Sequence, residues 1–226
     1  MRRWLGRRAA EPADWANAQL EARGINDPLV LAAMRAVPRD RFVPPDLARQ
    51  AYDDGALPIG HGQTISQPYI VARMTQALGL TDWPQTHEGA RPKVLDVGTG
   101  SGYQAAILAA LGAEVVSVER QPELAETARL LLIGLGYDVK VVAGDGSRGV
   151  PEEAPFAAIV VAAAAPQVPG PLVEQLLPDG VLVLPIGSRS EQVLTLVRPA
   201  PEGFVSAQLE AAVFVPLLGE HGFSGR

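Results

Sequence analysis

A short apolar strand that runs directly into a glycine-rich turn is the feature that most limits how this chain can fold. Residues 93–97 form the apolar run, and glycine then occupies three alternate positions, Gly98, Gly100 and Gly102. Glycine lets the backbone approach a ligand closely. A helix predicted to begin at Tyr103 would offer its free N–H groups to that ligand. The pattern therefore predicts a strand, a ligand-binding loop and a helix in direct succession.

The segments after this loop continue the alternation of strands and helices. Apolar runs predict strands at residues 114–118, 139–142, 156–161 and 181–186. Helices are predicted at residues 103–111 and 170–177, and from Pro122 to a stop at Gly134 and Gly136. This order predicts an α/β fold with a doubly wound, mostly parallel sheet and helices on both faces. Two further strands, at residues 192–197 and 204–215, would add an antiparallel edge.

The first part of the chain has a different texture, with short helical patterns separated by proline and glycine. An apolar stripe from Leu29 to Val37 predicts one helix, which stops at Pro38. Another helix is predicted to open at Pro68, since proline is tolerated at the first helical position. Residues 81–92 are rich in turn-forming residues and are predicted to be a linker loop.

Length sets the expected domain organisation. A chain of 226 residues is long enough for one α/β domain with a substantial core, and a second full domain is not expected. We therefore expect a single domain over residues 1–226. It comprises a helical N-terminal extension (1–89), a Rossmann-like core (90–190), and C-terminal strands with a tail (191–226).

Composition and charge disfavour several classes of protein. The net charge of −6 argues against a wide basic face for nucleic acid. The chain has no cysteine, which excludes disulfides and thiolate metal sites, and its three histidines have no metal-ligand spacing, so we expect no metal. The longest apolar run, residues 156–165, is too short to span a bilayer. The arginine-rich start lacks the apolar stretch of a signal peptide. We expect a cytoplasmic monomer without membrane partners.

Carboxylates stand at the ends of the two strands that follow the glycine loop. Glu119 ends the first, where an acid can accept hydrogen bonds from both ribose hydroxyls of a nucleoside. Asp145, followed by Gly146, ends the second, where it could meet an adenine. Taken alone, each is more typical of a solvated carboxylate or a turn-forming aspartate. Because ligands of open α/β sheets bind at the carboxyl ends of strands, three such ends in succession predict one nucleoside site.

The segment at residues 57–69 is the second notable motif. Its two glycines predict a pliable loop, and a run of polar side chains follows them. On physical grounds alone, we favour the interpretation that Ser66 or Gln67 caps the helix opening at Pro68.

Several stretches of the sequence resemble one known family. They are VPRDRFVP at 37–44, AYDDGALPIGHGQTISQPYIVARM at 51–74, VLDVGTGSGYQAAILAALGAEVVSVER at 94–120, GDG at 144–146, APFAAIVVAAAAPQVPGPLVEQLLPDG at 154–180 and VFVPLLGEHGF at 213–223. Together they resemble the protein-L-isoaspartate O-methyltransferases, which are class I S-adenosylmethionine-dependent methyltransferases. The likeness covers residues 25–223, and TISQP is its most specific part.

The resemblance implies a Rossmann-like protein repair enzyme. Such an enzyme transfers a methyl group from S-adenosyl-L-methionine to the α-carboxyl of L-isoaspartyl residues in damaged proteins and peptides. In that family the serine of TISQP is the active-site residue, which falls on Ser66. The cofactor-binding residues implied are Gln63, Thr64, Ile65, Asp96, Gly98, Thr99, Gly100, Ser101, Gly102, Glu119, Asp145 and Gly146.

The expected chemistry is methyl transfer from a sulfonium to a carboxylate. A carboxylate with a pKa of about 4 is already ionised at neutral pH, so no general base is required. This agrees with a sequence that has no Ser-His-Asp or Cys-His arrangement. Catalysis would come mainly from alignment of the reacting groups, and Ser66 would orient the carboxylate through a hydrogen bond.

Three alternatives stay open at this point. A tRNA or small-molecule methyltransferase would share the glycine loop, although a tRNA enzyme should carry basic clusters around its cleft. A non-catalytic cofactor-binding homologue would be expected to have damaged motifs, and both motifs are intact. An NAD dehydrogenase is weakened by Tyr103, which replaces the last glycine of the dinucleotide fingerprint.

The chain also departs from the family pattern around the fourth strand. Where the family commonly has aspartate and threonine, this chain has Ala157 and Ala162. The departure bears on rate and substrate preference, and not on cofactor binding.

Overall fold

A computed structural model describes residues 15–225 of the chain. The arginine-rich start, for which no signal peptide is predicted, lies outside the described residues. The strands are β1 (Leu57–Gly60), β2 (Gln63–Ile65), β3 (Lys93–Val97), β4 (Glu114–Glu119), β5 (Val139–Ala143), β6 (Phe156–Val161), β7 (Leu176–Gly187), β8 (Gln192–Ala200) and β9 (Gly203–Ala212).

Helices connect and cover these strands. The α-helices are α1 (Trp15–Gln19), α2 (Pro28–Ala36), α3 (Pro68–Ala77), α4 (Trp83–Thr86), α5 (Tyr103–Ala110), α6 (Pro122–Leu135) and α7 (Gly170–Glu174). The 3-10 helices are η1 (Glu21–Arg23), η2 (Arg39–Arg41), η3 (Pro45–Gln50), η4 (Leu80–Asp82), η5 (Gly146–Arg148) and η6 (Pro151–Glu153). No helix among the described residues has the length and apolar character needed to cross a bilayer.

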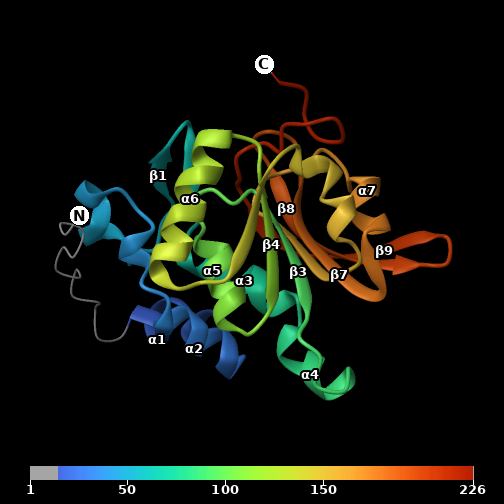
Figure 1. Ribbon diagram of the computed structural model, residues 1–226, viewed down its shortest axis with the longest axis horizontal. Helices are drawn as coiled ribbons and strands as arrows, with labels where there is room; N and C mark the ends of the chain where they lie inside the picture. Colours follow the sequence, from blue (N-terminus) through green and yellow to red (C-terminus); the bar gives the residue numbers. More distant parts are fainter. Residues whose placement is uncertain (1–14, 226) are drawn as a thin grey trace.

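The central element is a seven-stranded sheet, counted over the described residues, with the strand order β5-β4-β3-β6-β7-β8-β9 (Figure 1). Strands β3 to β7 pair in parallel, whereas β8 and β9 pair antiparallel at one edge. The predicted α/β fold and its antiparallel C-terminal edge are therefore confirmed. The order reverses between β3 and β6, because β4 and β5 extend the sheet on one side of β3 and β6 starts the other.

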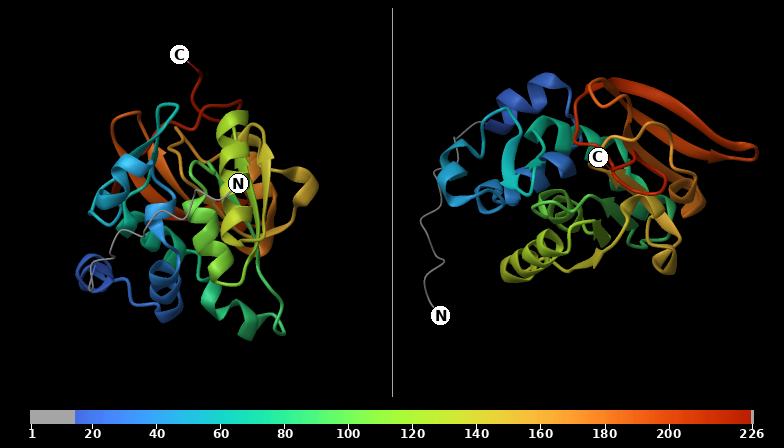
Figure 2. Two further views of the ribbon diagram at one scale, coloured as in Figure 1. Left: turned by 60° about the vertical axis from the view of Figure 1, so that its left-hand side comes forward. Right: turned by 90° about the horizontal axis from the view of Figure 1, so that it is seen from above.

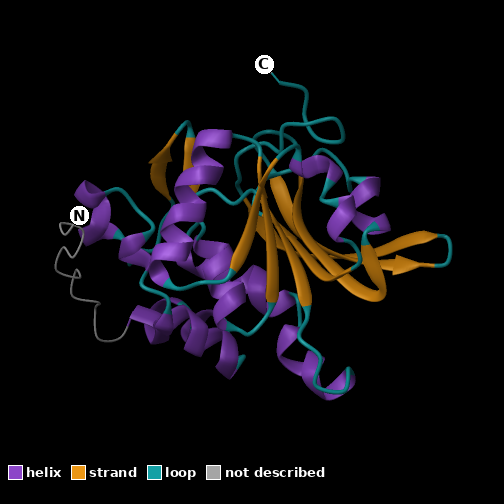
Figure 3. Ribbon diagram, viewed as in Figure 1, coloured by secondary structure: helices purple, strands orange, loops and turns teal. Residues whose placement is uncertain are grey.

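Both faces of the sheet are buried, and alternate residues of each central strand point to different cores. In β6, Ala158 and Val160 belong to the cluster that also contains apolar residues of α2, α3 and α5. Ile159 and Val161 belong to the cluster under α7. Helices accordingly lie on both sides of the sheet in Figure 3. This alternation follows from the two-residue repeat of a strand.

The N-terminal segment packs onto the first of these cores and is tied there by a buried arginine. The Arg39 side chain is fully buried, and its Nε donates to the carbonyl oxygen of Ala51 at 2.7 Å. Its guanidinium also lies over the ring of Tyr103, 4.9 Å from the centroid. Tyr103 is the first residue of α5, so Arg39 links the chain before the β1-β2 hairpin to the helix after the glycine loop.

Residues 57–65, predicted as a pliable loop, form a hairpin instead, with a register shift between Pro58 and Gly60. Strands β1 and β2 pair antiparallel with Gly60 opposite Gln63, which leaves His61 and Gly62 as a two-residue turn. Both turn residues have positive φ, 53° and 70°, as a tight hairpin turn of type I′ requires. A non-glycine residue such as His61 seldom has positive φ, so the sequence did not predict this turn.

The prediction of a linker loop at residues 81–92 was wrong for its first half, which contains the end of η4 and all of α4. Pro84 occupies the first turn of α4, a position that proline favours. The helix is closed by stacking of the rings of Trp83 and His87, whose centroids lie 3.5 Å apart. His87 Nε2 lies 2.9 Å from the carboxylate of Asp179, so this segment is held against the start of β7.

Several other helix and strand ends differ from the predicted ones by a few residues. Leu29 is 53% exposed and lies outside the buried side of α2, which Val30 and Leu31 begin instead. Gly134 lies inside α6, and Gly136 alone, with φ of 82°, ends that helix. The predicted helix at 170–177 ends at Glu174 because β7 begins earlier than predicted, and the predicted strand at 204–215 ends at Ala212.

Candidate functional site

A cavity opens at the carboxyl ends of β3, β4 and β6, where the strand order reverses. Ligands of open α/β sheets bind at such a switch point. We call this the strand-end cavity. Predicted site residues that line it are Gln63, Thr64, Ile65, Ser66, Gly98, Thr99, Gly100, Ser101, Glu119 and Gly146. Three others, Asp96, Gly102 and Asp145, are not among its lining residues.

The glycine loop forms the floor of the strand-end cavity. Gly98 and Gly100 have φ of 92° and 53°, a backbone region that side chains rarely adopt. A Cβ on Gly100 would come within 3.4 Å of Ile59 Cδ1. Gly100 therefore lets the β1-β2 hairpin approach the loop closely, and the hairpin and the loop enclose the cavity between them.

Gly102 has a different position at the start of α5. It is the N-cap residue with φ of 89°, and a Cβ there would lie 3.1 Å from Leu132 Cδ1 on α6. The third glycine thus brings two helices together and does not face the cavity.

Glu119 is the last residue of β4, and its carboxylate reaches the strand-end cavity while only 7% of the residue is exposed. Oε2 accepts a hydrogen bond from the Gly100 N–H at 3.0 Å, and Oε1 accepts one from the Gln121 N–H at 3.0 Å. The carboxylate therefore fixes the glycine loop against the start of α6. Each oxygen retains a lone pair that can accept a hydrogen bond from a ligand hydroxyl.

Asp96 pairs with Ser117, two residues before Glu119 along β4, and is fully buried. The Thr99 hydroxyl lies 2.6 Å from Ser117 Oγ, which donates to Asp96 Oδ2 at 2.7 Å. Among the described residues, Asp96 Oδ1 has no hydrogen-bond partner. Burial raises the pKa of Asp96 to about 7, although the Ser117 hydrogen bond acts in the opposite direction and the charge of Glu119 adds to the rise.

Asp145 uses its carboxylate within the protein. Oδ1 accepts from the N–H and hydroxyl of Ser147, at 2.9 and 2.7 Å, and Oδ2 accepts from the Glu220 N–H at 2.9 Å. Partial burial by itself raises the pKa of Asp145, but these hydrogen bonds outweigh it and leave the pKa below its usual range. The strand-end acid thus joins β5 to the C-terminal segment.

Ser66 lies between β2 and α3, half-buried beside the strand-end cavity. Its neighbour Gln67 donates through Nε2 to Asp54 Oδ1 at 2.6 Å, and Arg23 forms an ion pair with Asp54 at 3.1 Å. No side chain caps α3 at its N-cap residue, Gln67. The helix-capping interpretation of this motif is therefore wrong, and Gln63, Thr64 and Ser66 line the strand-end cavity instead.

A second cavity, which we call the side cleft, adjoins the first. Its lining includes Ile70 of α3, Glu191 just before β8 and Val213 just after β9. Four residues line both cavities, namely Thr64, Ser66, Ala162 and Val215. Ala162 is the position where the family commonly has threonine. Its methyl group therefore replaces a hydroxyl at the boundary of the two cavities.

Sequence reasoning missed one wall of the strand-end cavity, formed by residues 215–218. Val71 and Met74 of α3 were also missed; they line the cavity as part of the apolar side of that helix. The stretch at residues 213–223 had been recognised as similar to the family but given no role. An apolar run directly after the last strand was the only signal of its position.

The two cavities together suit transfer of a group between two ligands. The glycine loop and one acidic residue, Glu119, line the first space, and Ser66 lies at its boundary with the second. Within the described residues, no histidine lines either cavity, and no group of three metal-ligating side chains is placed to hold a metal ion.

Comparisons with known sequences agree on one family. The profile of the family described as protein-L-isoaspartate(D-aspartate) O-methyltransferase (PCMT) matches residues 16–222. The protein-L-isoaspartate O-methyltransferase of Aeropyrum pernix is 51% identical over 232 residues, covering 98% of this chain and 86% of the relative. That of Gloeobacter violaceus is 52% identical over 204 residues, covering 89% and 96% of the two chains.

Solved structures give the same result. A protein-L-isoaspartate O-methyltransferase superposes with a TM-score of 0.77 at 28% identity, covering 89% of this chain and 64% of its own. A putative protein-L-isoaspartate O-methyltransferase of Plasmodium falciparum, in complex with S-adenosyl-L-homocysteine, gives a TM-score of 0.75 at 26% identity. That match covers 92% of this chain and 99% of the other.

Proposed function

The chain belongs to the protein-L-isoaspartate O-methyltransferase family, and from this premise we propose how its own residues divide the work of the reaction. The enzyme transfers a methyl group from S-adenosyl-L-methionine to the α-carboxyl of an L-isoaspartyl residue. The products are the methyl ester and S-adenosyl-L-homocysteine.

The residues of the strand-end cavity fit the adenosyl group of this methyl donor. Gly98 and Gly100 leave space at the loop that a side chain would occupy. Glu119 offers acceptor lone pairs at the tip of β4, where ribose hydroxyls can donate. Thr99, Ser101 and Gly146 complete the polar lining, and Gln63, Thr64 and Ile65 cover it from the hairpin side. When bound here, the donor supplies an electrophilic methyl group.

Asp96, Gly102 and Asp145 support this site from behind. Asp96 holds the loop through Ser117 and Thr99, and Gly102 packs the helix that follows the loop. Their contribution to cofactor binding is therefore proposed to be indirect.

The side cleft is proposed to receive the isoaspartyl peptide, with its α-carboxylate directed at Ser66. The carboxylate is ionised at neutral pH, so the site needs to orient it and need not deprotonate it. A hydrogen bond from the Ser66 hydroxyl would hold one carboxylate oxygen while the other faces the methyl group. Alignment of this kind, together with exclusion of water, is the main source of rate.

One observation carries this assignment: Ser66 lines both cavities. A residue at that boundary is in position to contact both the methyl donor and the acceptor. Gln67, Asp54 and Arg23 hold the backbone beside it, which supports a fixed orientation of the serine.

The proposal is tested with paired peptides that differ only in one isoaspartyl or aspartyl residue. Each is incubated with the enzyme and S-adenosylmethionine labelled in its methyl group. We expect base-labile label on the isoaspartyl peptide alone, because the acceptor is a carboxyl that only this isomer presents correctly. Label on neither peptide would refute the activity, and label on a tRNA pool instead would favour a different substrate class.

We also propose that the chain acts as a single domain, as a monomer and in the cytoplasm. The shared hydrophobic cluster of the N-terminal helices and the sheet supports one domain. Light scattering at micromolar concentration tests the monomer, and cell fractionation tests the location.

A further inference from the structure

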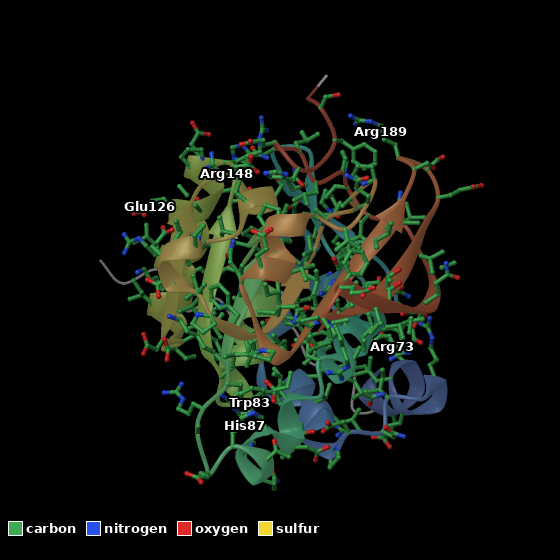
Figure 4. All side chains as sticks on the ribbon, turned by 90° about the vertical axis from the view of Figure 1, so that its right-hand side faces the viewer. Arg73, Trp83, His87, Glu126, Arg148 and Arg189 are labelled. Atoms are coloured by element: carbon green, nitrogen blue, oxygen red, sulfur yellow. The ribbon has the colours of Figure 1, made fainter. Side chains whose placement is uncertain are left out.

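The C-terminal segment, residues 215–223, crosses the carboxyl ends of the parallel strands. Figures 1 and 2 show it at the same end of the molecule as the tips of β3 and β4. Residues 215–218 form a wall of the strand-end cavity. In Figure 4, Arg148 and Arg189 lie on either side of the segment, far from the Trp83 and His87 pair at the opposite end.

The segment is a closed loop with its own hydrogen bonds. The Leu217 N–H donates to the Ala164 carbonyl at 2.7 Å, which attaches the segment to the chain after β6. The Phe223 N–H donates back to the Leu217 carbonyl at 2.7 Å, which closes the loop. Leu217 is only 6% exposed and packs into the apolar cluster on the α7 side of the sheet.

Two side chains at the tip of β5 hold the far end of this loop. Asp145 Oδ2 accepts from the Glu220 N–H at 2.9 Å, and Ser147 Oγ accepts from the His221 N–H at 3.0 Å. Ser147 is fully buried and also donates to Asp145 Oδ1. Two successive backbone N–H groups are therefore bound by two linked side chains, an arrangement we call the tail clamp.

Gly219 makes the tail clamp possible by having no side chain. A Cβ at this position would overlap Asp145 Oδ1 and would lie 2.5 Å from Ser147 Oγ. The φ of Gly219 is outside the positive region, so its backbone is open to any residue. Glycine is thus needed at this position so that the backbone can lie against Asp145 and Ser147, and not for its backbone conformation.

We propose that Asp145, Ser147 and Gly219 are positioning residues for S-adenosylmethionine, because they hold the C-terminal segment in place as a wall of the cofactor site. This inference rests on the proposed cofactor site. None of the three residues lines the cavity, so they act through residues 215–218. Loss of the clamp lets this wall move away, and the cavity then binds its ligand more weakly.

The experiment compares Gly219→Ala with a matched glycine variant, Gly225→Ala. Gly225 lies in the same tail, and a Cβ there would meet nothing within 4 Å. Binding of S-adenosylhomocysteine is measured by isothermal titration calorimetry. We expect Gly219→Ala to weaken binding on the order of tenfold, the loss of one or two hydrogen bonds, and Gly225→Ala to bind as the natural chain does.

Steady-state kinetics separate positioning from a general loss of stability. Gly219→Ala should raise KM for S-adenosylmethionine while kcat at saturating donor stays nearly unchanged, since Ser66 is untouched. A purely structural defect would instead reduce the amount of active enzyme, which lowers kcat at constant KM. Hydrogen exchange at the Glu220 and His221 amides should also become faster in the variant.

Ser147→Ala provides a second route if Gly219→Ala does not fold. It removes the acceptor for His221 and should weaken binding about threefold, in the same direction. The double variant Gly219→Ala/Ser147→Ala should bind like Gly219→Ala alone, because both substitutions disrupt the same tail clamp.

Two results would overturn the inference, and they can be told apart. If the natural chain binds S-adenosylhomocysteine and the folded Gly219→Ala and Ser147→Ala variants bind it equally well, the tail clamp has no positioning role. If the natural chain does not bind it at all, the proposed cofactor site fails, and this inference fails with it.

Discussion

At the scale of single residues, the distance of an acid from the end of its strand decides what that acid does. Glu119 is the last residue of β4 and reaches the cavity. Asp96 is the last residue but one of β3, lies opposite Ser117 in the sheet and is fully buried. The first acid is available to a ligand, whereas the second is a costly internal group whose unpaired oxygen is removed from water.

The buried carboxyl predicts a specific pH dependence of stability. In the folded chain Asp96 has a pKa of about 7, whereas its ordinary value is near 3.8. Between these values the folded state binds the proton and the unfolded state does not, so the stability contributed by this group is lost as pH rises through that range. Asp96→Asn should remove the loss.

Urea unfolding at pH 5 and pH 8 measures this effect. We expect the natural chain to lose on the order of 2–3 kcal/mol more than Asp96→Asn does between the two conditions. Asp138→Asn, at an exposed position, serves as the control and should follow the natural chain. If the Asp96→Asn curve also followed it, Asp96 would not titrate in this range.

Ser66→Ala tests the proposed orientation of the substrate carboxylate. Loss of a hydrogen bond to a charged group should lower kcat by about tenfold to a hundredfold, and binding of S-adenosylhomocysteine should stay nearly intact. Initial rates with an isoaspartyl peptide measure the first quantity and calorimetry the second. Ser206→Ala, on the exposed face of β9, should change neither. Full turnover in Ser66→Ala would remove this serine from the mechanism.

At the scale of elements, two glycines of the loop lie against different neighbours. A Cβ on Gly100 would touch Ile59 of the hairpin at an ordinary contact distance, whereas a Cβ on Gly102 would crowd Leu132 of α6. The tight contact at Gly102 is the one that a side chain would disturb.

Gly102→Ala should destabilise the fold more than a glycine variant with the same backbone. Gly112 has φ of 87°, close to the 89° of Gly102, but a Cβ there meets nothing within 4 Å. Alanine at either position costs about 1–2 kcal/mol for the positive φ. Gly102→Ala should cost about 1–3 kcal/mol more for the contact with Leu132. Equal midpoints of urea unfolding for the two variants would contradict this account.

The elements also show which parts of the fold the sequence could predict. The alternation of strands and helices from Lys93 to Gly187 was predictable, because short apolar runs and helical apolar stripes alternate along this part of the chain. The hairpin was not, since its turn depends on a histidine at positive φ. The short helix α4 depends on ring stacking between Trp83 and His87, a contact that periodicity does not express.

The same distinction applies to the candidate site. Ser66 and the glycine loop could be recognised because each lies in a continuous motif. The hydrogen bonds of Asp145 could not be predicted, because one partner, Glu220, is 75 residues away in the sequence. The sequence indicated an acid at a strand end, and only the folded chain reveals that the tail occupies it.

At the scale of the whole molecule, the N-terminal segment and the sheet share one hydrophobic core. Residues of α2 and α3 belong to the same cluster as Val94 of β3 and Val160 of β6. Arg39 adds a buried polar link between the two parts. The hairpin that carries the polar motif lies between α2 and α3 in sequence, so its position depends on both helices.

We therefore expect the two parts to unfold in one cooperative step. Native-state hydrogen exchange in increasing urea should show amides of α2 and of β3 losing protection together. The edge strand β9, whose residues 203–208 are exposed, serves as an internal comparison and should open at lower urea. Loss of protection in α2 well before β3 would mean that the N-terminal segment folds separately.

The wall formed by residues 215–218 has a consequence for how the protein is made. A ribosome delivers the glycine loop and Ser66 roughly a hundred residues or more before it delivers this stretch. A nascent chain that has already formed its central strands therefore still lacks one side of the pocket. The proposed cofactor site is therefore complete only after residues 215–218 have been synthesised, well after the central strands.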